Sequence, residues 1–131
     1  MKALKNAKGF TLIELIVIII VLGILAATAI PKYVDLRNEA REATARGILG
    51  GMRGANALLF ADRALKYTTG IYTILDVYAA AQVGGVEATG TIDEYSMTIN
   101  IGGVVYTYGI DKLGQAPTTL PRVYVTNNPN W

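Results

Sequence analysis

The feature that most constrains this chain is a run of sixteen uncharged residues from Leu15 to Ile30, eleven of which are Leu, Ile or Val. At roughly −0.3 to −0.6 kcal/mol each, these side chains favour insertion into a membrane by about 3–7 kcal/mol. Glu14 opposes insertion by at most about 3 kcal/mol, and by less because it lies near one end of the run. As a helix, residues 10–30 would span about 31 Å, close to the thickness of a bilayer core. The sequence therefore predicts a helix that can cross a membrane.

Two features distinguish this segment from a plain membrane anchor. A basic leader, with Lys2, Lys5 and Lys8, ends at Gly9, where the apolar residues begin, and Glu14 follows only five residues later. The lysines predict that the N-terminus lies on the cytoplasmic side of the membrane. A carboxylate in an apolar span is costly, so Glu14 is predicted to have a function.

The stretch Gly9-Phe10-Thr11-Leu12-Ile13-Glu14 resembles the processing site of type IV prepilins and of the related type II secretion pseudopilins. The resemblance implies that a prepilin peptidase cuts after Gly9 and methylates the new N-terminal Phe10, and that Glu14 is needed for assembly. Pro31 also fits the family. From Ala26 to about Asn56 the chain further resembles the mannose-sensitive haemagglutinin-type pilins, whereas the last half matches no motif.

The resemblance implies a structural subunit that polymerises with copies of itself through its N-terminal helix. The expected product is an extracellular filament, a type IV pilus with roles in adhesion or motility. The implied partners are the prepilin peptidase/methyltransferase and the pilus assembly machinery of the bacterial inner membrane, where the subunit would reside before assembly. The alternative is a pseudopilin of a type II secretion system, and a third hypothesis is a membrane-anchored enzyme or ligand-binding domain.

The N-terminal segment also has two simpler interpretations, a secretory signal peptide and a plain anchor. Ala27-Thr28-Ala29 has the small-x-small pattern of a signal cleavage site. Three observations count against it: the apolar run is longer than usual, Glu14 lies inside it, and Pro31 would be the second residue after the cut.

The predicted fold is α+β, a long N-terminal stalk helix packed against a small antiparallel sheet. Four parts are expected: a leader (1–9), the membrane and filament-core half of the helix (10–31), its amphipathic half (32–66), and a connecting region with the C-terminal sheet (67–131). Gly23 and Pro31 weaken the helix, since Gly is flexible and Pro lacks an amide donor. We therefore expect a continuous or gently kinked helix in the subunit and a loosened one within residues 23–31 of the filament.

In the second half of the helix, five small residues and one Leu recur at spacings of three and four and define one face: Ala40, Ala43, Gly47, Gly51, Gly54 and Leu58. Ile48, Met52, Ala55 and Leu59 widen it. Glycine costs about 1 kcal/mol relative to Ala in a helix, so these positions predict close approach by the sheet, with a bend or break as the alternative. The charges from Asp35 to Arg46 indicate either a solvated face or a contact between subunits.

The sheet is predicted from a period of two. Apolar and polar residues alternate over 95–101, Gly102-Gly103 favours a two-residue turn, and 104–110 and 122–126 read as further strands. Residues 71–92 are expected to be a connection that includes a short helix or strand.

Composition excludes several functions. The chain has no Cys and no His, so it has no disulfide, no imidazole base and no Cys/His zinc site. Three of its 12 basic residues lie in the leader, which leaves 9 against 10 acidic ones and gives no support for nucleic-acid binding. Asp93, Glu94 and Asp111 are too few ligands for calcium. We expect no cofactor, no metal and no enzymatic activity.

Overall fold

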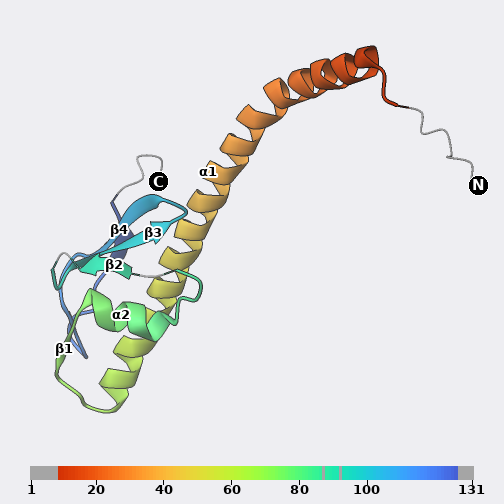
Figure 1. Cartoon of the computed structure of the whole chain (residues 1–131). Helices are drawn as coiled ribbons and strands as arrows, with labels where there is room; N and C mark the ends of the chain where they lie inside the picture. The colour runs from red at the N-terminus through yellow and green to blue at the C-terminus, as the bar shows by residue number, and fades with distance from the viewer. Residues whose placement is uncertain (1–8, 87, 92, 127–131) are drawn as a thin grey trace, which may run out of the picture. The chain divides into compact units, whose positions relative to one another are not determined.

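The computed structural model describes residues 9–86, 88–91 and 93–126 (Figure 1). The chain forms two units, one ending at Asn38 and one beginning at Glu39. Helix α1 (Leu12–Leu65) belongs to both, and all other elements lie in the second unit, which we call the head.

The N-terminal unit is helix α1 up to Asn38. The helix is continuous through Gly23 and Pro31, as predicted for the single subunit. Every side chain from Leu12 to Asn38 is exposed. By length and composition, α1 is the one helix in the described part of the chain that could cross a membrane.

The head contains a four-stranded antiparallel sheet in the order β2-β3-β4-β6, formed by Ala88–Thr91, Ser96–Ile101, Val104–Ile110 and Val123–Val125. A two-residue turn joins β3 to β4, with Ile101 opposite Val104. Gly102 and Gly103 have φ values of 59° and 90°, and a two-residue hairpin turn favours such positive φ values at its central residues. The predicted hairpin and third strand are confirmed, and the α+β fold with them.

The connection over residues 71–92 has more structure than the sequence indicated. It contains β1 (Ile71–Tyr72), α2 (Ile74–Ala81) and the edge strand β2. A capping box begins α2, because Thr73 N–H donates to Asp76 Oδ2 over 2.7 Å. Strand β1 pairs with β5 (Gly114–Gln115) in a separate two-stranded sheet. The prediction of a short helix or strand here is therefore confirmed and extended.

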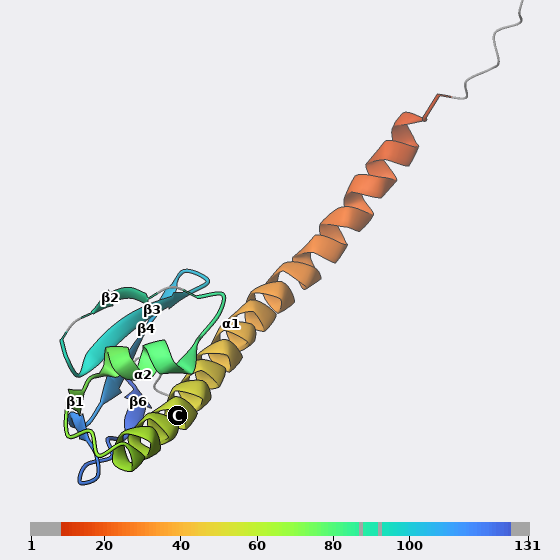
Figure 2. The same cartoon turned by 90° about the horizontal axis from the view of Figure 1, so that it is seen from below.

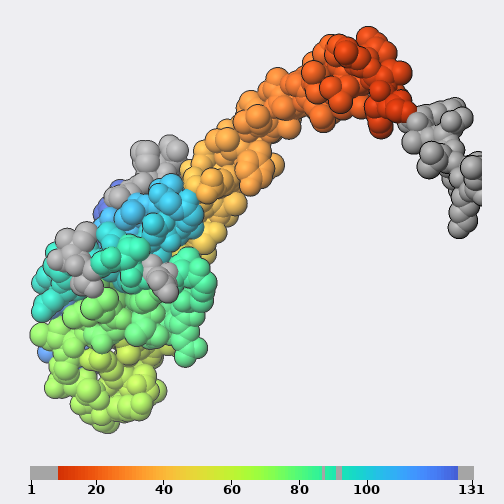
Figure 3. All heavy atoms as spheres, viewed as in Figure 1, coloured from red at the N-terminus to blue at the C-terminus, as the bar shows by residue number. Residues whose placement is uncertain are grey.

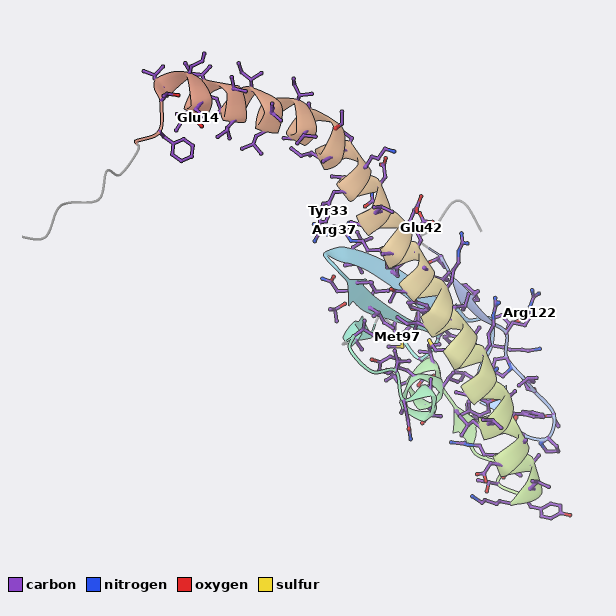
Figure 4. All side chains as sticks on the ribbon, turned by 90° about the vertical axis from the view of Figure 1, so that its right-hand side faces the viewer. Glu14, Tyr33, Arg37, Glu42, Met97 and Arg122 are labelled. Atoms are coloured by element: carbon purple, nitrogen blue, oxygen red, sulfur yellow. The ribbon has the colours of Figure 1, made fainter. Side chains whose placement is uncertain are left out.

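The core of the head lies between the sheet and the second half of α1. Met97 of β3 and Tyr108 of β4 are paired, fully buried and on the same face of the sheet. Figure 4 shows Met97 on the side of the sheet next to α1. The Tyr108 hydroxyl donates to the carbonyl of Ala45 in α1 over 3.0 Å, and Figure 2 shows β6 beside the same helix. In the space-filling view, residues of α2 and the sheet form one surface over this part of the head (Figure 3).

The prediction of which residues of α1 the sheet covers is partly wrong. The buried residues of α1 are Ala45, Ile48, Leu49, Met52, Ala55 and Asn56, whereas the glycines and Leu58 are exposed. A Cβ added at Gly47, Gly50, Gly51 or Gly54 would meet nothing within 4 Å, so no sheet backbone lies across them. The helix does not break there either. The sheet packs on the stripe with the larger apolar side chains because this stripe removes more apolar area from water, at about 25 cal/mol per Å².

Candidate assembly site at the start of the long helix

A capping box closes the N-terminal end of α1. Thr11 precedes the first helical residue, and its backbone N–H donates to Glu14 Oε2 over 3.3 Å. The Thr11 hydroxyl donates to the same oxygen over 3.2 Å, and Glu14 N–H donates to Thr11 Oγ1 over 3.3 Å. Each residue therefore satisfies a backbone donor of the other, as in the S/T-x-x-E pattern.

The box gives Glu14 a partner within its own subunit. Its carboxylate also lies in the first helical turn, where the helix dipole favours negative charge (Figure 4). The sequence analysis predicted a function for Glu14 but did not predict its contact with Thr11. The signal was present, since a Thr three residues before a Glu at the start of an apolar run is the sequence form of a capping box.

The remaining predicted site residues are spread along the N-terminal unit. Gly9 and Phe10 precede α1, and Phe10 is 76% exposed. Gly23 and Pro31 lie inside α1. Pro31 has no N–H, so the Ala27 carbonyl lacks its usual donor four residues on. Thr28 adds a local bond, from its hydroxyl to the Leu25 carbonyl over 3.0 Å. Of these predicted site residues, Glu14 is the one whose side chain forms a hydrogen bond with another described residue.

Two acidic residues of the head, Asp93 and Asp111, accept hydrogen bonds in its loops. Asp93 Oδ1 accepts from Ser96 Oγ and from Tyr95 N–H, each over 2.8 Å, and these bonds lower the pKa of the Asp93 carboxyl. Asp111 Oδ1 accepts from the backbone N–H of Arg122 over 2.7 Å. Within the described residues, no three His, Cys, Asp or Glu side chains are grouped so that they could bind a metal ion.

Comparison with known proteins identifies relatives over most of the chain. Residues 4–30 match the family described as the prokaryotic N-terminal methylation motif. The major component of the type IV narrow pilus of Thermus thermophilus is 34% identical over 114 residues, which cover 86% of this chain and 94% of the relative. Fimbrial protein Q of Moraxella bovis is 31% identical over 107 residues, covering 81% of this chain and 66% of the relative.

A further relative matches only the N-terminal region. A fimbrial protein of Pseudomonas aeruginosa is 59% identical over 32 residues, which cover 24% of this chain and 21% of the relative. No solved structure matches the chain significantly. The match to the Thermus protein over 86% of this chain and the methylation motif agree with the exposed apolar helix, its capped Glu14 and the α+β head. The chain therefore belongs to the type IV pilin family, and it is a structural subunit of a type IV pilus and not an enzyme.

Proposed function

We propose that residues 1–9 are a leader, that a prepilin peptidase cuts between Gly9 and Phe10, and that Phe10 is then N-methylated. The match of the methylation motif to residues 4–30 supports this proposal, as does the junction of basic and apolar residues at Gly9. After the cut, residues 10–31 would form the membrane and filament-core half of the stalk and 32–66 its amphipathic half. Residues 67–131 would complete the head.

We propose further that the chain is the major subunit of its pilus, because the relative matched over nearly its whole length is a major pilus component. The other relatives described above are also fimbrial proteins, which favours a pilus over a secretion pseudopilus. The subunit would wait in the inner membrane, where the assembly machinery adds it to an extracellular filament for adhesion or motility. Within the family, we propose a resemblance to the mannose-sensitive haemagglutinin-type pilins over the residues from Ala26 to about Asn56.

The observation that carries this proposal is the complete exposure of a long apolar helix. All side chains from Leu12 to Asn38 are exposed, and the sixteen between Leu15 and Ile30 carry no charge. Such a surface is stable only when lipid or other apolar side chains cover it. A membrane covers it before assembly, and the corresponding helices of neighbouring subunits cover it afterwards.

Glu14 sets the register of assembly in this proposal. The segment 10–31 has no Lys or Arg, so cleavage creates the nearest cation, the amino group of Phe10. In the single subunit the carboxylate accepts two bonds from Thr11. When the helix enters the filament core, a charge pair between the amine of an incoming subunit and Glu14 of an earlier one avoids the penalty of several kcal/mol for a buried unpaired charge.

Two measurements test the proposal. The intact mass of the filament subunit should correspond to a chain that begins with N-methylated Phe10. A chain that begins at Ile30 would instead identify a cleaved signal peptide.

Glu14→Leu should leave membrane insertion and leader removal unchanged and reduce sheared filaments strongly relative to the membrane pool. Thr28→Leu, a polar-to-apolar change in the same helix, is the matched control and should assemble normally. Normal filament yield from Glu14→Leu would refute the role of Glu14.

A further inference from the structure

A hollow of about 370 Å³ opens on the head between α1 and the segment that leads into β6. It is lined by Arg53, Asn56, Ala57, Leu120, Pro121, Arg122 and Val123. A second hollow of about 250 Å³ shares Arg53, Arg122 and Val123 with it and adds Asp111 and Tyr124. Two arginines from distant parts of the sequence therefore line both hollows. We call the larger hollow the arginine groove.

The walls of the arginine groove are fixed by hydrogen bonds. Arg53 Nε donates to the Val123 carbonyl over 3.1 Å, and Asn56 Nδ2 donates to the Pro121 carbonyl over 2.8 Å. Asn56 is itself only 4% exposed and accepts a bond from the Tyr72 hydroxyl. The groove is thus preformed, so a ligand need not order its walls on binding.

The arginine groove is lined by positive charge and by no acidic side chain. Among the described residues, neither Arg53 nor Arg122 forms an ion pair, and Arg53 uses only its Nε in the bond to Val123. Figure 4 shows the side chain of Arg122 pointing away from the ribbon. Asp111 lies in the smaller hollow, where it disfavours an anion. A guanidinium can donate two hydrogen bonds to the two oxygens of a carboxylate, so the larger hollow suits a carboxylate ligand.

We infer that the arginine groove binds a side-chain carboxylate of a second copy of this chain, an inference that rests on the proposed polymerisation. Without its leader, the chain carries 9 basic and 10 acidic residues, so copies of it are close to charge balance. Three exposed acids make neither an ion pair nor a side-chain hydrogen bond within the described residues, and they are Asp35, Glu39 and Glu94. Leu120, 45% exposed at the groove, and the exposed Ala57 supply apolar area that such a contact would cover.

Charge reversal in the complete chain tests the groove. Arg122→Glu should lower the ratio of sheared filament to membrane subunit about tenfold, because it replaces an attraction across the interface by a repulsion. Lys112→Glu is the matched control, since it makes the same change at an exposed cation that lines neither hollow. It should change the ratio less than about twofold. Normal filaments from Arg122→Glu would overturn the inference.

Charge swaps then identify the carboxylate. Arg122→Glu combined with Asp35→Arg, Glu39→Arg or Glu94→Arg should restore filaments for one of the three acids. If none of the swaps restores them, the second-copy occupant is wrong. A normal membrane level of Arg122→Glu subunit separates this result from a folding defect.

Cross-linking gives an independent readout, because the chain has no native cysteine. Ala57→Cys combined with Cys at a residue next to the identified acid leaves both charges of the contact in place, and it should give a ladder of disulfide-linked subunits from wild-type-like filaments, whereas each single Cys should not. If no ladder forms and inorganic phosphate alone binds the isolated subunit at the groove, the site takes a free anion and the inference fails. If wild type and Lys112→Glu form no filament at all, the proposed function fails instead.

Discussion

Tyr72 and Asn56 are joined by a buried hydrogen bond, in which the tyrosine hydroxyl donates to Asn56 Oδ1 over 3.1 Å. The amide nitrogen of Asn56 donates in turn to the Pro121 carbonyl. One side chain of α1 thereby connects β1 to the segment before β6. Asn56 is 4% exposed, and among the described residues it is the buried one with an amide or charged side chain.

Removing this side chain should destabilise the head. Asn56→Ala leaves the Tyr72 hydroxyl and the Pro121 carbonyl buried without partners, at a cost of about 1–3 kcal/mol each. Tyr72→Phe removes only one bond and should cost about 1 kcal/mol. Urea unfolding of the detergent-solubilised subunit, followed by near-ultraviolet circular dichroism, measures both. An Asn56→Ala midpoint equal to that of Tyr72→Phe would show that the bond to Pro121 contributes nothing.

Two glycines should respond to Ala in opposite directions. A Cβ at Gly114 would overlap the ring of Tyr72, which is fully buried, so Gly114→Ala should destabilise the subunit by about 1–3 kcal/mol. At Gly51 a Cβ meets nothing, so Gly51→Ala should stabilise the helix by up to about 1 kcal/mol. Thermal unfolding of the two variants checks the signs. A destabilised Gly51→Ala subunit would show that this face of α1 is covered within the subunit.

The head should lose stability in alkali. Burial raises the pKa of Tyr108 strongly, with a smaller contribution from nearby Tyr106. Burial also raises the pKa of Tyr72, although the charge of Arg63 opposes this. Below about pH 10 both hydroxyls are protonated in the folded and the unfolded chain, and their contribution is fully present. Above it the unfolded chain loses protons that the folded chain retains, so the free energy of unfolding falls as the pH rises.

Tyrosine variants attribute this pH dependence. Tyr108→Phe should make the fall between pH 10 and 12 less steep, at a cost of about 1 kcal/mol at pH 7 for the lost bond to Ala45. Tyr67→Phe, at a side chain 92% exposed, is the control and should leave the slope unchanged. Equal slopes for Tyr108→Phe and wild type would remove Tyr108 as the cause.

In the filament, α1 should loosen within residues 23–31. The subunit helix is continuous there, but Pro31 leaves one carbonyl without its donor and Gly23 lacks a side chain to restrict the backbone. Neighbouring helices can satisfy the freed groups inside a filament, whereas lipid cannot. A filament density map gives the answer directly. An unbroken straight helix through this segment would contradict the prediction.

Local patterns in the sequence predicted the parts of the fold that depend on local chemistry. The length of α1 followed from its apolar run and helical spacing, and the β3–β4 hairpin from alternation around Gly102-Gly103. The capping box at Thr11 was equally local and could have been read from its four residues. Each of these signals is a pattern among residues that lie close together in the sequence.

The rest depends on contacts between distant segments. The two-residue strands β1 and β5 have no periodicity, and only their pairing defines them. Spacing along α1 identified one broad face, but packing against distant segments decided that Leu49 is buried and Gly51 exposed. The arginine groove was missed for the same reason, because Arg53 and Arg122 meet only when β6 packs beside α1.

The placement of β6 has a mechanical consequence for a filament under tension. This strand pairs with β4 over three residues. The side chains of Arg53 and Asn56 donate hydrogen bonds to the backbone carbonyls of Val123 and Pro121 at its N-terminal end. Because the chain has no cysteine, no disulfide holds this strand, and its hydrogen bonds can break and re-form. A pulling force on the head would break these hydrogen bonds and so dissipate energy. When the force is removed, the bonds would form again without any redox chemistry. Strand β6 could therefore detach from the head under load and return to its place when the load is removed.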